Sequence, residues 1–185
     1  MGAERRKGAR LIAIDGVNGD AVMARARAEI AGLPRAGRGG VSGWDASGVF
    51  GDLLVAGDDA GRPSARTLLL LYAADLAFRL RWEIRPKLEE GLVVVAAPYV
   101  ATAIAFGRAA GLHAGWLDDV FGFAPRAADA RRVDAAPARR SHRSGFVEFG
   151  CDHVSAASPG LSRREILERV RTHLQRTAGR RGASA

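Results

Sequence analysis

The chain has 185 residues, of which 48% are hydrophobic and 26% are charged. This length and balance are typical of one globular domain with a buried core, and they exclude an intrinsically disordered chain. The formal net charge of +8 and the isoelectric point near 11.0 fit a protein that binds nucleic acid or another polyanion. However, only Lys7 and Lys87 are lysines among the 28 cationic residues, and such an arginine excess also follows from codon bias in a GC-rich genome. Both explanations of the charge stay open.

The cysteine count, the apolar runs and the positions of the histidines favour a cytoplasmic protein with no metal centre. The single cysteine, Cys151, excludes an internal disulfide framework. The longest apolar run, at residues 68–74, is much shorter than the roughly 20 residues that cross a bilayer, so no membrane partner is expected. The histidines are scattered, and Cys151-Asp152-His153 is too compact to be a zinc-binding pattern.

In the first part of the chain, a loose basic tail at 1–9 precedes alternating strands and helices. Val22, Ala26 and Ile30 recur at helical spacing after a buried strand, and Gly32 with Pro34 ends that helix. The elements predicted up to residue 61 are a strand at 10–15, a helix of about twelve residues, a Gly/Arg loop at 35–40, a strand at 41–46, a helix at 48–56 and a turn cluster at 57–61.

The strongest helical segment is 63–90, with Pro63 in its first turn and Pro86 dividing it. After it we predict a central strand at 92–97, helices at 99–110 and 113–121, and weak strands at 128–135 and 151–157. Ser162 and Glu165 form a capping box for the last helix, with Leu161 and Ile166 as its hydrophobic staple. The alternation predicts an α/β fold with a mainly parallel sheet, as a single domain over 10–177 followed by a disordered tail at 178–185.

A glycine-containing turn, Asp15–Met23, follows the first strand directly. A nucleotide-binding loop needs glycines so that backbone N–H groups can surround phosphate, a Lys for the β- and γ-phosphates, and a Ser or Thr hydroxyl for magnesium. Val22 and Met23 stand where the Lys and the Ser or Thr are expected. The segment is therefore either an ordinary turn or a phosphate loop that has lost its chemistry.

Two later segments resemble the thymidylate kinase family. Thr67-Leu-Leu-Leu-Leu-Tyr-Ala-Ala-Asp75 is similar to the Leu-Leu-Phe-Ala-Ala-Asp-Arg helix of that family. Ile84-Arg-Pro-Lys-Leu-Glu-Glu-Gly91 is similar to its Ile-x-Pro-x-Leu-x-x-Gly turn, and Ala97-Pro98-Tyr99 stands at its Asp-Arg-Tyr triplet. The resemblance covers most of the first 110 residues and implies a P-loop NTPase-like, three-layer α/β/α fold.

The resemblance also assigns positions in the site, and most of those that carry charge are changed. Leu76 stands for the arginine that meets the monophosphate, Ala97 and Pro98 for the Asp and Arg of the triplet, and Gly107 for the glutamine that reads the base. The remnant of the nucleotide loop comprises Asp15, Gly16, Asn18, Gly19 and Asp20. The remnant of the substrate pocket comprises Tyr72, Asp75 and Tyr99.

The family also has a mobile, arginine-bearing lid over ATP, and an Arg-rich stretch follows residue 125 here. Arg139, Arg140 and Arg143 are either lid residues that bind an anion or part of a solvated basic loop. Trp44, Trp82 and Trp116 are expected to be packing or interface residues.

Three functions follow as expectations. The first is a catalytically impaired kinase-like protein that acts by binding, with a second copy of itself or another protein as partner. The second is a working dTMP kinase that uses ATP and Mg²⁺ through substitute residues. The third is an Arg-rich binder of nucleic acid or another polyanion.

Overall fold

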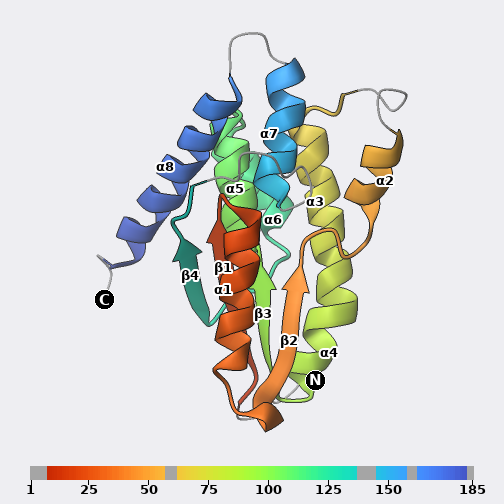
Figure 1. The fold of residues 1–185 in the computed structure, drawn as a ribbon, viewed down its shortest axis with the longest axis vertical. Coiled ribbons are helices and arrows are strands. Elements are labelled where there is room, and N and C mark those ends of the chain that lie inside the picture. The colour runs from red at the N-terminus through yellow and green to blue at the C-terminus, as the bar shows by residue number, and fades with distance from the viewer. Residues whose placement is uncertain (1–7, 57–61, 137–144, 158–161, 183–185) are drawn as a thin grey trace.

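The computed structural model describes residues 8–56, 62–136, 145–157 and 162–182 (Figure 1). Its centre is a four-stranded parallel sheet in the order β2-β3-β1-β4. The predicted strands at 10–15, 92–97 and 128–135 are confirmed. The strands are β1 (Arg10–Gly16), β2 (Arg38–Gly43), β3 (Val93–Ala97) and β4 (Asp129–Val133).

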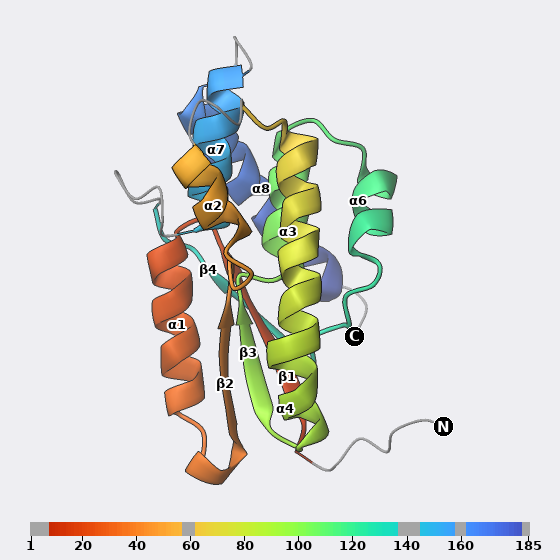
Figure 2. The same cartoon turned by 90° about the vertical axis from the view of Figure 1, so that its right-hand side faces the viewer.

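One helix, α1 (Gly19–Ala31), covers one face of the sheet, and the other helices lie on or beyond the opposite face (Figure 2). Val22 and Ala26 of α1 pack on Ile12 and Ile14 of β1 in the smaller of two buried clusters. The larger cluster lies between the opposite face of the sheet and the remaining helices. The predicted three-layer α/β/α arrangement is therefore confirmed.

The long helical segment is divided as predicted, although its start differs. It consists of α3 (Ala65–Arg79), a π-helical turn at Leu80–Ile84 and α4 (Arg85–Glu89). Pro86 is the second residue of α4, separated by Arg85 from the π-helical turn that ends at Ile84, which agrees with its inability to donate a helical hydrogen bond. Pro63 lies outside the helix because Ser64 is the N-cap and accepts a hydrogen bond from the Thr67 backbone N–H at 3.1 Å.

Two predicted elements are corrected by the structure. The second strand spans Arg38–Gly43 instead of 41–46, and a Cβ at Gly39 would lie 2.8 Å from the Val93 carbonyl oxygen, so the glycine lets β2 approach β3. The segment 151–157 is helical and belongs to α7 (Phe146–Ala157). Its buried residues Phe146, Phe149 and Val154 recur at helical spacing, a pattern that the short window at 151–157 conceals.

The remaining helices lie where the sequence predicts them. They are α2 (Val49–Ala56), α5 (Val100–Ala109), α6 (Ala114–Phe121) and α8 (Arg163–Gly182). The capping box of α8 is confirmed, because Ser162 Oγ donates to Glu165 Oε2 at 2.7 Å and accepts from the Glu165 N–H at 3.2 Å. Helix α8 extends past residue 177, where a tail was expected.

The predictions for residues 1–7, the turn cluster at 57–61 and the staple residue Leu161 lie outside the described residues. Across the ranges described, none of the helices combines the length and the apolar character that a bilayer span requires.

Candidate functional site

The connection between β1 and α1 is too short to be a phosphate-binding loop. Such a loop places four residues between its first glycine and the glycine before the lysine, positions that correspond here to Gly16 and Ala21. Helix α1 already begins at Gly19, and Asn18 caps it by accepting a hydrogen bond from the Ala21 N–H at 2.9 Å. Residues that would surround a phosphate are thus the first turn of an ordinary capped helix.

A carboxylate from α7 occupies the anion position at the start of α1. Glu148 is fully buried, and its Oε2 accepts a hydrogen bond from the Gly19 N–H at 3.2 Å. Gly145 permits this approach, because a Cβ there would lie 2.7 Å from Gly19 Cα. Backbone N–H groups and the helix dipole stabilise a negative charge at a helix N-terminus, so the position of Glu148 at the Gly19 N–H is a favourable one for a carboxylate. Figure 1 shows α7 at the end of the sheet where α1 begins.

Val22 and Met23 pack in the core where the lysine and the magnesium ligand are expected. Val22 is 1% exposed, and Met23 packs beside it on the cluster between α1 and the sheet. Among the residues that the structure describes, no group of three or more His, Cys, Asp or Glu side chains could hold a metal ion. The residues at this loop therefore do not fit ATP with Mg²⁺.

Asp15 is a structural cap of α5. Its Oδ1 accepts hydrogen bonds from the Tyr99 N–H at 2.9 Å, from the Thr102 N–H at 2.9 Å and from Thr102 Oγ1 at 2.7 Å. The Thr102 hydroxyl in turn accepts from the Gly16 N–H at 3.2 Å. Burial raises the pKa of Asp15, and these hydrogen bonds and the Arg132 guanidinium oppose that rise only in part. The carboxylate thus connects the end of β1 to α5.

An aromatic ring of α7 packs against Tyr72, a residue of the substrate-pocket remnant. Tyr72 is fully buried, and its hydroxyl donates to the Tyr99 carbonyl oxygen at 3.0 Å. The Phe146 ring centroid lies 4.5 Å from that of Tyr72 and 5.1 Å from that of Phe106. Burial raises the pKa of the Tyr72 hydroxyl well above its ordinary value. Trp44 also packs in this cluster, with its ring centroid 4.9 Å from that of Phe50, so its predicted packing role is confirmed.

Asp75 holds the turn after β2. Its carboxylate accepts hydrogen bonds from the Asp45 N–H at 3.1 Å and from the Ser47 N–H and hydroxyl, both at 2.9 Å. Asp45 accepts in turn from the N–H groups of Phe50 and Gly51 at the start of α2. In the structure, Asp75 is therefore bound to backbone of its own chain.

Sequence reasoning missed two residues of this region, Glu148 and Arg79. Arg79 is fully buried, and its guanidinium donates to the Ser42 carbonyl oxygen at 2.7 Å and to the Pro98 carbonyl oxygen at 3.0 Å. It thereby joins the ends of β2 and β3. One signal was available, because Tyr72, Asp75 and Arg79 recur at helical spacing on the buried side of α3. Glu148 had no such signal, since it lies 129 residues from its partner.

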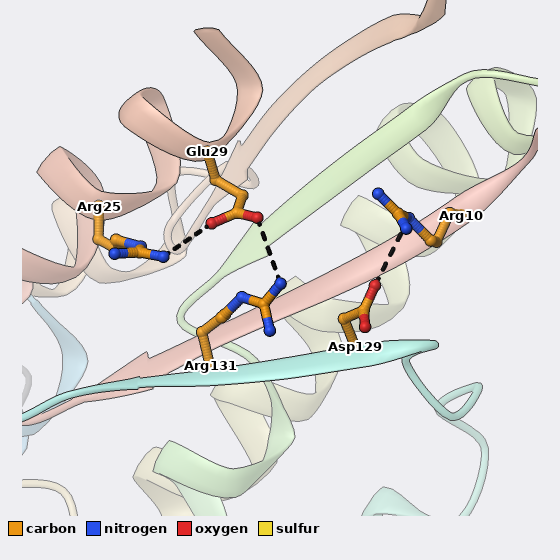
Figure 3. Close-up of polar contacts among 5 residues, drawn as sticks. All are labelled: Arg10, Arg25, Glu29, Asp129 and Arg131. Carbon is orange, nitrogen blue, oxygen red and sulfur yellow. Dashed lines mark hydrogen bonds and ion pairs between the residues drawn. The ribbon is translucent and has the colours of Figure 1, made fainter. Parts of the chain in front are cut away.

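Three arginines nearer to the other end of the sheet, where β1 and β4 begin, contact carboxylates (Figure 3). Glu29 contacts Arg25 at 3.0 Å and Arg131 at 3.6 Å, and Asp129 contacts Arg10 at 3.5 Å. The proposed lid residues Arg139, Arg140 and Arg143 lie outside the described residues. The last described residue before them is Ala136. Its carbonyl oxygen accepts a hydrogen bond from Asn18 Nδ2 of the candidate loop at 2.6 Å.

Comparison with known proteins finds relatives for part of the chain and a structural match for nearly all of it. Probable thymidylate kinases of Pyrococcus abyssi, Pyrococcus horikoshii and Thermococcus gammatolerans are each 40% identical over 68 residues, which are 37% of this chain. The match spans about a third (33%) of the length of each of these relatives. A thymidylate kinase structure from Ehrlichia chaffeensis aligns with a TM-score of 0.67 at 15% identity, covering 94% of this chain and 82% of that one. This likeness confirms the P-loop NTPase-like α/β fold. No protein-family model matches the chain.

Proposed function

Since this chain is a thymidylate kinase-like protein, we propose that it keeps the kinase scaffold without phosphoryl transfer and acts by binding a second copy of itself or another protein. The observation that carries the proposal is the position of α7. Glu148 lies at the phosphate position of α1, and Phe146 lies against Tyr72 at the base position. One helix of the chain thus takes the place of both ends of a nucleotide.

The charges that phosphoryl transfer requires are also missing. Catalysis of this reaction rests on positioning and on electrostatic stabilisation of the transferred group. One lost charged contact costs about 3 kcal/mol in the transition state, on the scale of a lost oxyanion donor. Val22, Met23 and Leu76 supply no charge and are packed in apolar surroundings, so the chain lacks several of these contacts at once.

An exposed apolar stripe on α3 and the π-helical turn after it supports self-association as the retained activity. Leu70, Phe78 and Trp82 are 51%, 39% and 64% exposed, and their spacing of eight and four residues puts them on one side of the helical segment. Exposed apolar patches of this kind mark interaction surfaces. We propose that a second copy covers this stripe.

The loss of phosphate binding is tested by replacing Glu148. Glu148→Ala would leave the Gly19 N–H and the positive end of α1 without their carboxylate, while Glu148→Gln keeps a carbonyl acceptor and serves as the matched control. Pyrophosphate should raise the melting temperature of Glu148→Ala and leave the original protein and Glu148→Gln unchanged. Equal stabilisation of all three proteins would show that Glu148 does not fill the anion site.

Two further measurements separate the proposal from its alternatives. No dTDP should form from ATP and dTMP; a turnover of about 1 per second or more, as for ordinary kinases, would favour the active enzyme. Light scattering should give a dimer that Trp82→Glu dissociates, whereas Phe123→Glu, which changes an exposed ring beyond α6, should not. A monomeric original protein would refute self-association, and DNA binding that falls steeply with salt would favour the polyanion binder.

A further inference from the structure

A cavity of about 170 Å³ lies between β4 and the first half of α5. It is separate from the phosphate position, because Gly19 and Glu148 are not among the residues that line it. Within the described chain β4 is the last strand of the sheet, so the cavity lies beside an edge strand. Its residues have no part in the function proposed above, apart from Asp15, which caps α5.

The strand register places small residues under the cavity and charges at one end of it. Ala13 pairs with Ala130, and Asp15 pairs with Arg132, so these four side chains lie on the same face of the sheet. Arg131 lies between the two β4 positions and points to the opposite face, where it contacts Glu29 of α1 (Figure 3). The two alanines leave a flat apolar floor that ends at Asp15 and Arg132.

The walls of the cavity are formed before any ligand binds. Val100 and Ile104 of α5 are half-buried and line one side. Pro125 and Arg126 line another side, and the Tyr99 hydroxyl fixes that segment by donating to the Pro125 carbonyl oxygen at 2.7 Å. A preformed, mostly apolar cavity with a few convergent polar groups is typical of a small-molecule site.

The charges around the cavity favour an anion. The cavity is lined by Arg126 and Arg132 and by one carboxylate, Asp15, whose Oδ1 accepts three hydrogen bonds from the start of α5. The side chains that line the cavity thus have an excess of positive charge over an apolar floor. An apolar cavity of about 150 Å³ takes up benzene, so the volume here suits a single ring.

We propose that this cavity binds a small organic anion, with a flat apolar body on Ala13 and Ala130 and a carboxylate or phosphate group at Arg126 and Arg132. The test uses 4-fluorobenzoate as the probe, with the uncharged 4-fluorobenzamide as its control, in ligand-observed ¹⁹F NMR. The benzoate should broaden and saturate with a Kd near or below about 1 mM, and the amide should bind about tenfold more weakly. Phenyl phosphate as competitor then distinguishes a phosphate from a carboxylate preference.

Three variants locate the binding. Arg126→Ala changes an exposed residue, so the fold should be kept while benzoate affinity falls about tenfold, the usual loss for a charged hydrogen bond. Ala130→Phe should abolish binding by filling the floor. Arg25→Ala removes an arginine of α1 on the opposite face of the sheet, outside the cavity lining, and should bind like the original protein. Absence of benzoate binding, equal binding of the amide, or an unchanged affinity in Arg126→Ala would overturn the proposal.

Discussion

Replacing Phe146 by alanine tests whether the packing of α7 against the site region stabilises the fold. Phe146 is 1% exposed, and its ring centroid lies 4.5 Å from Tyr72, 5.1 Å from Phe106 and 5.8 Å from Phe50. A buried Phe→Ala change costs about 3–5 kcal/mol, and each aromatic pair adds about 0.5–1.5 kcal/mol beyond its buried area. We therefore expect a loss of about 4–5 kcal/mol, a large part of the roughly 5–15 kcal/mol that stabilises a domain.

Urea unfolding followed by circular dichroism measures this loss. Phe123→Ala is the matched control, because Phe123 is 42% exposed and its removal should change the free energy of unfolding by no more than about 0.5 kcal/mol. Phe146→Ala should also leave an apolar cavity beside Tyr72, so saturating benzene should restore part of the lost stability. A loss in Phe146→Ala as small as in the control would refute the packing described here.

Three other predictions concern residues of the same region. Val22→Lys with Met23→Ser should not produce dTMP phosphorylation, because Glu148 and the missing arginines remain; measurable dTDP would contradict this. The raised pKa of Asp15 means that the folded protein binds a proton more tightly than the unfolded chain, whose ordinary value is 3.8. Stability from this group is thus lost as pH rises through its folded pKa. Urea unfolding should therefore show Asp15→Asn gaining stability relative to the original protein as pH rises above the unfolded value of 3.8; a pH-independent difference would oppose this. Burial raises the pKa of Cys151 to about 12, so this thiol should resist alkylation until the protein is unfolded, and rapid labelling of the native protein would disagree.

The parts of the fold that are encoded locally could be predicted from the sequence. The apolar runs of β1 and β3 and the Ser162–Glu165 capping box depend on neighbouring residues, and each was found near its predicted position. The second strand was misplaced because Gly39 and Gly40 resemble a loop until β3 is known to pack against them.

The content of the site depends on contacts between distant segments, and these could not be predicted. Glu148 meets Gly19 only because α7 returns to the start of α1, and no residue near Glu148 in the sequence indicates that return. The role of Phe146 likewise becomes apparent only from its ring contact with Tyr72. The sequence therefore indicates which charges are absent from the loop, whereas the contacts of Glu148 and Phe146 with this region are visible only in the structure.

We propose that Glu148 and Phe146 occupy the positions of a nucleotide's phosphate and base. Calorimetric titration of the protein with Mg²⁺-ATP in the presence of dTMP measures whether either position can still take up a nucleotide. We predict no saturable heat at ligand concentrations up to about 1 mM, where a Kd of the same size corresponds to about −4.1 kcal/mol. Saturable binding of either nucleotide with a micromolar Kd would contradict the account.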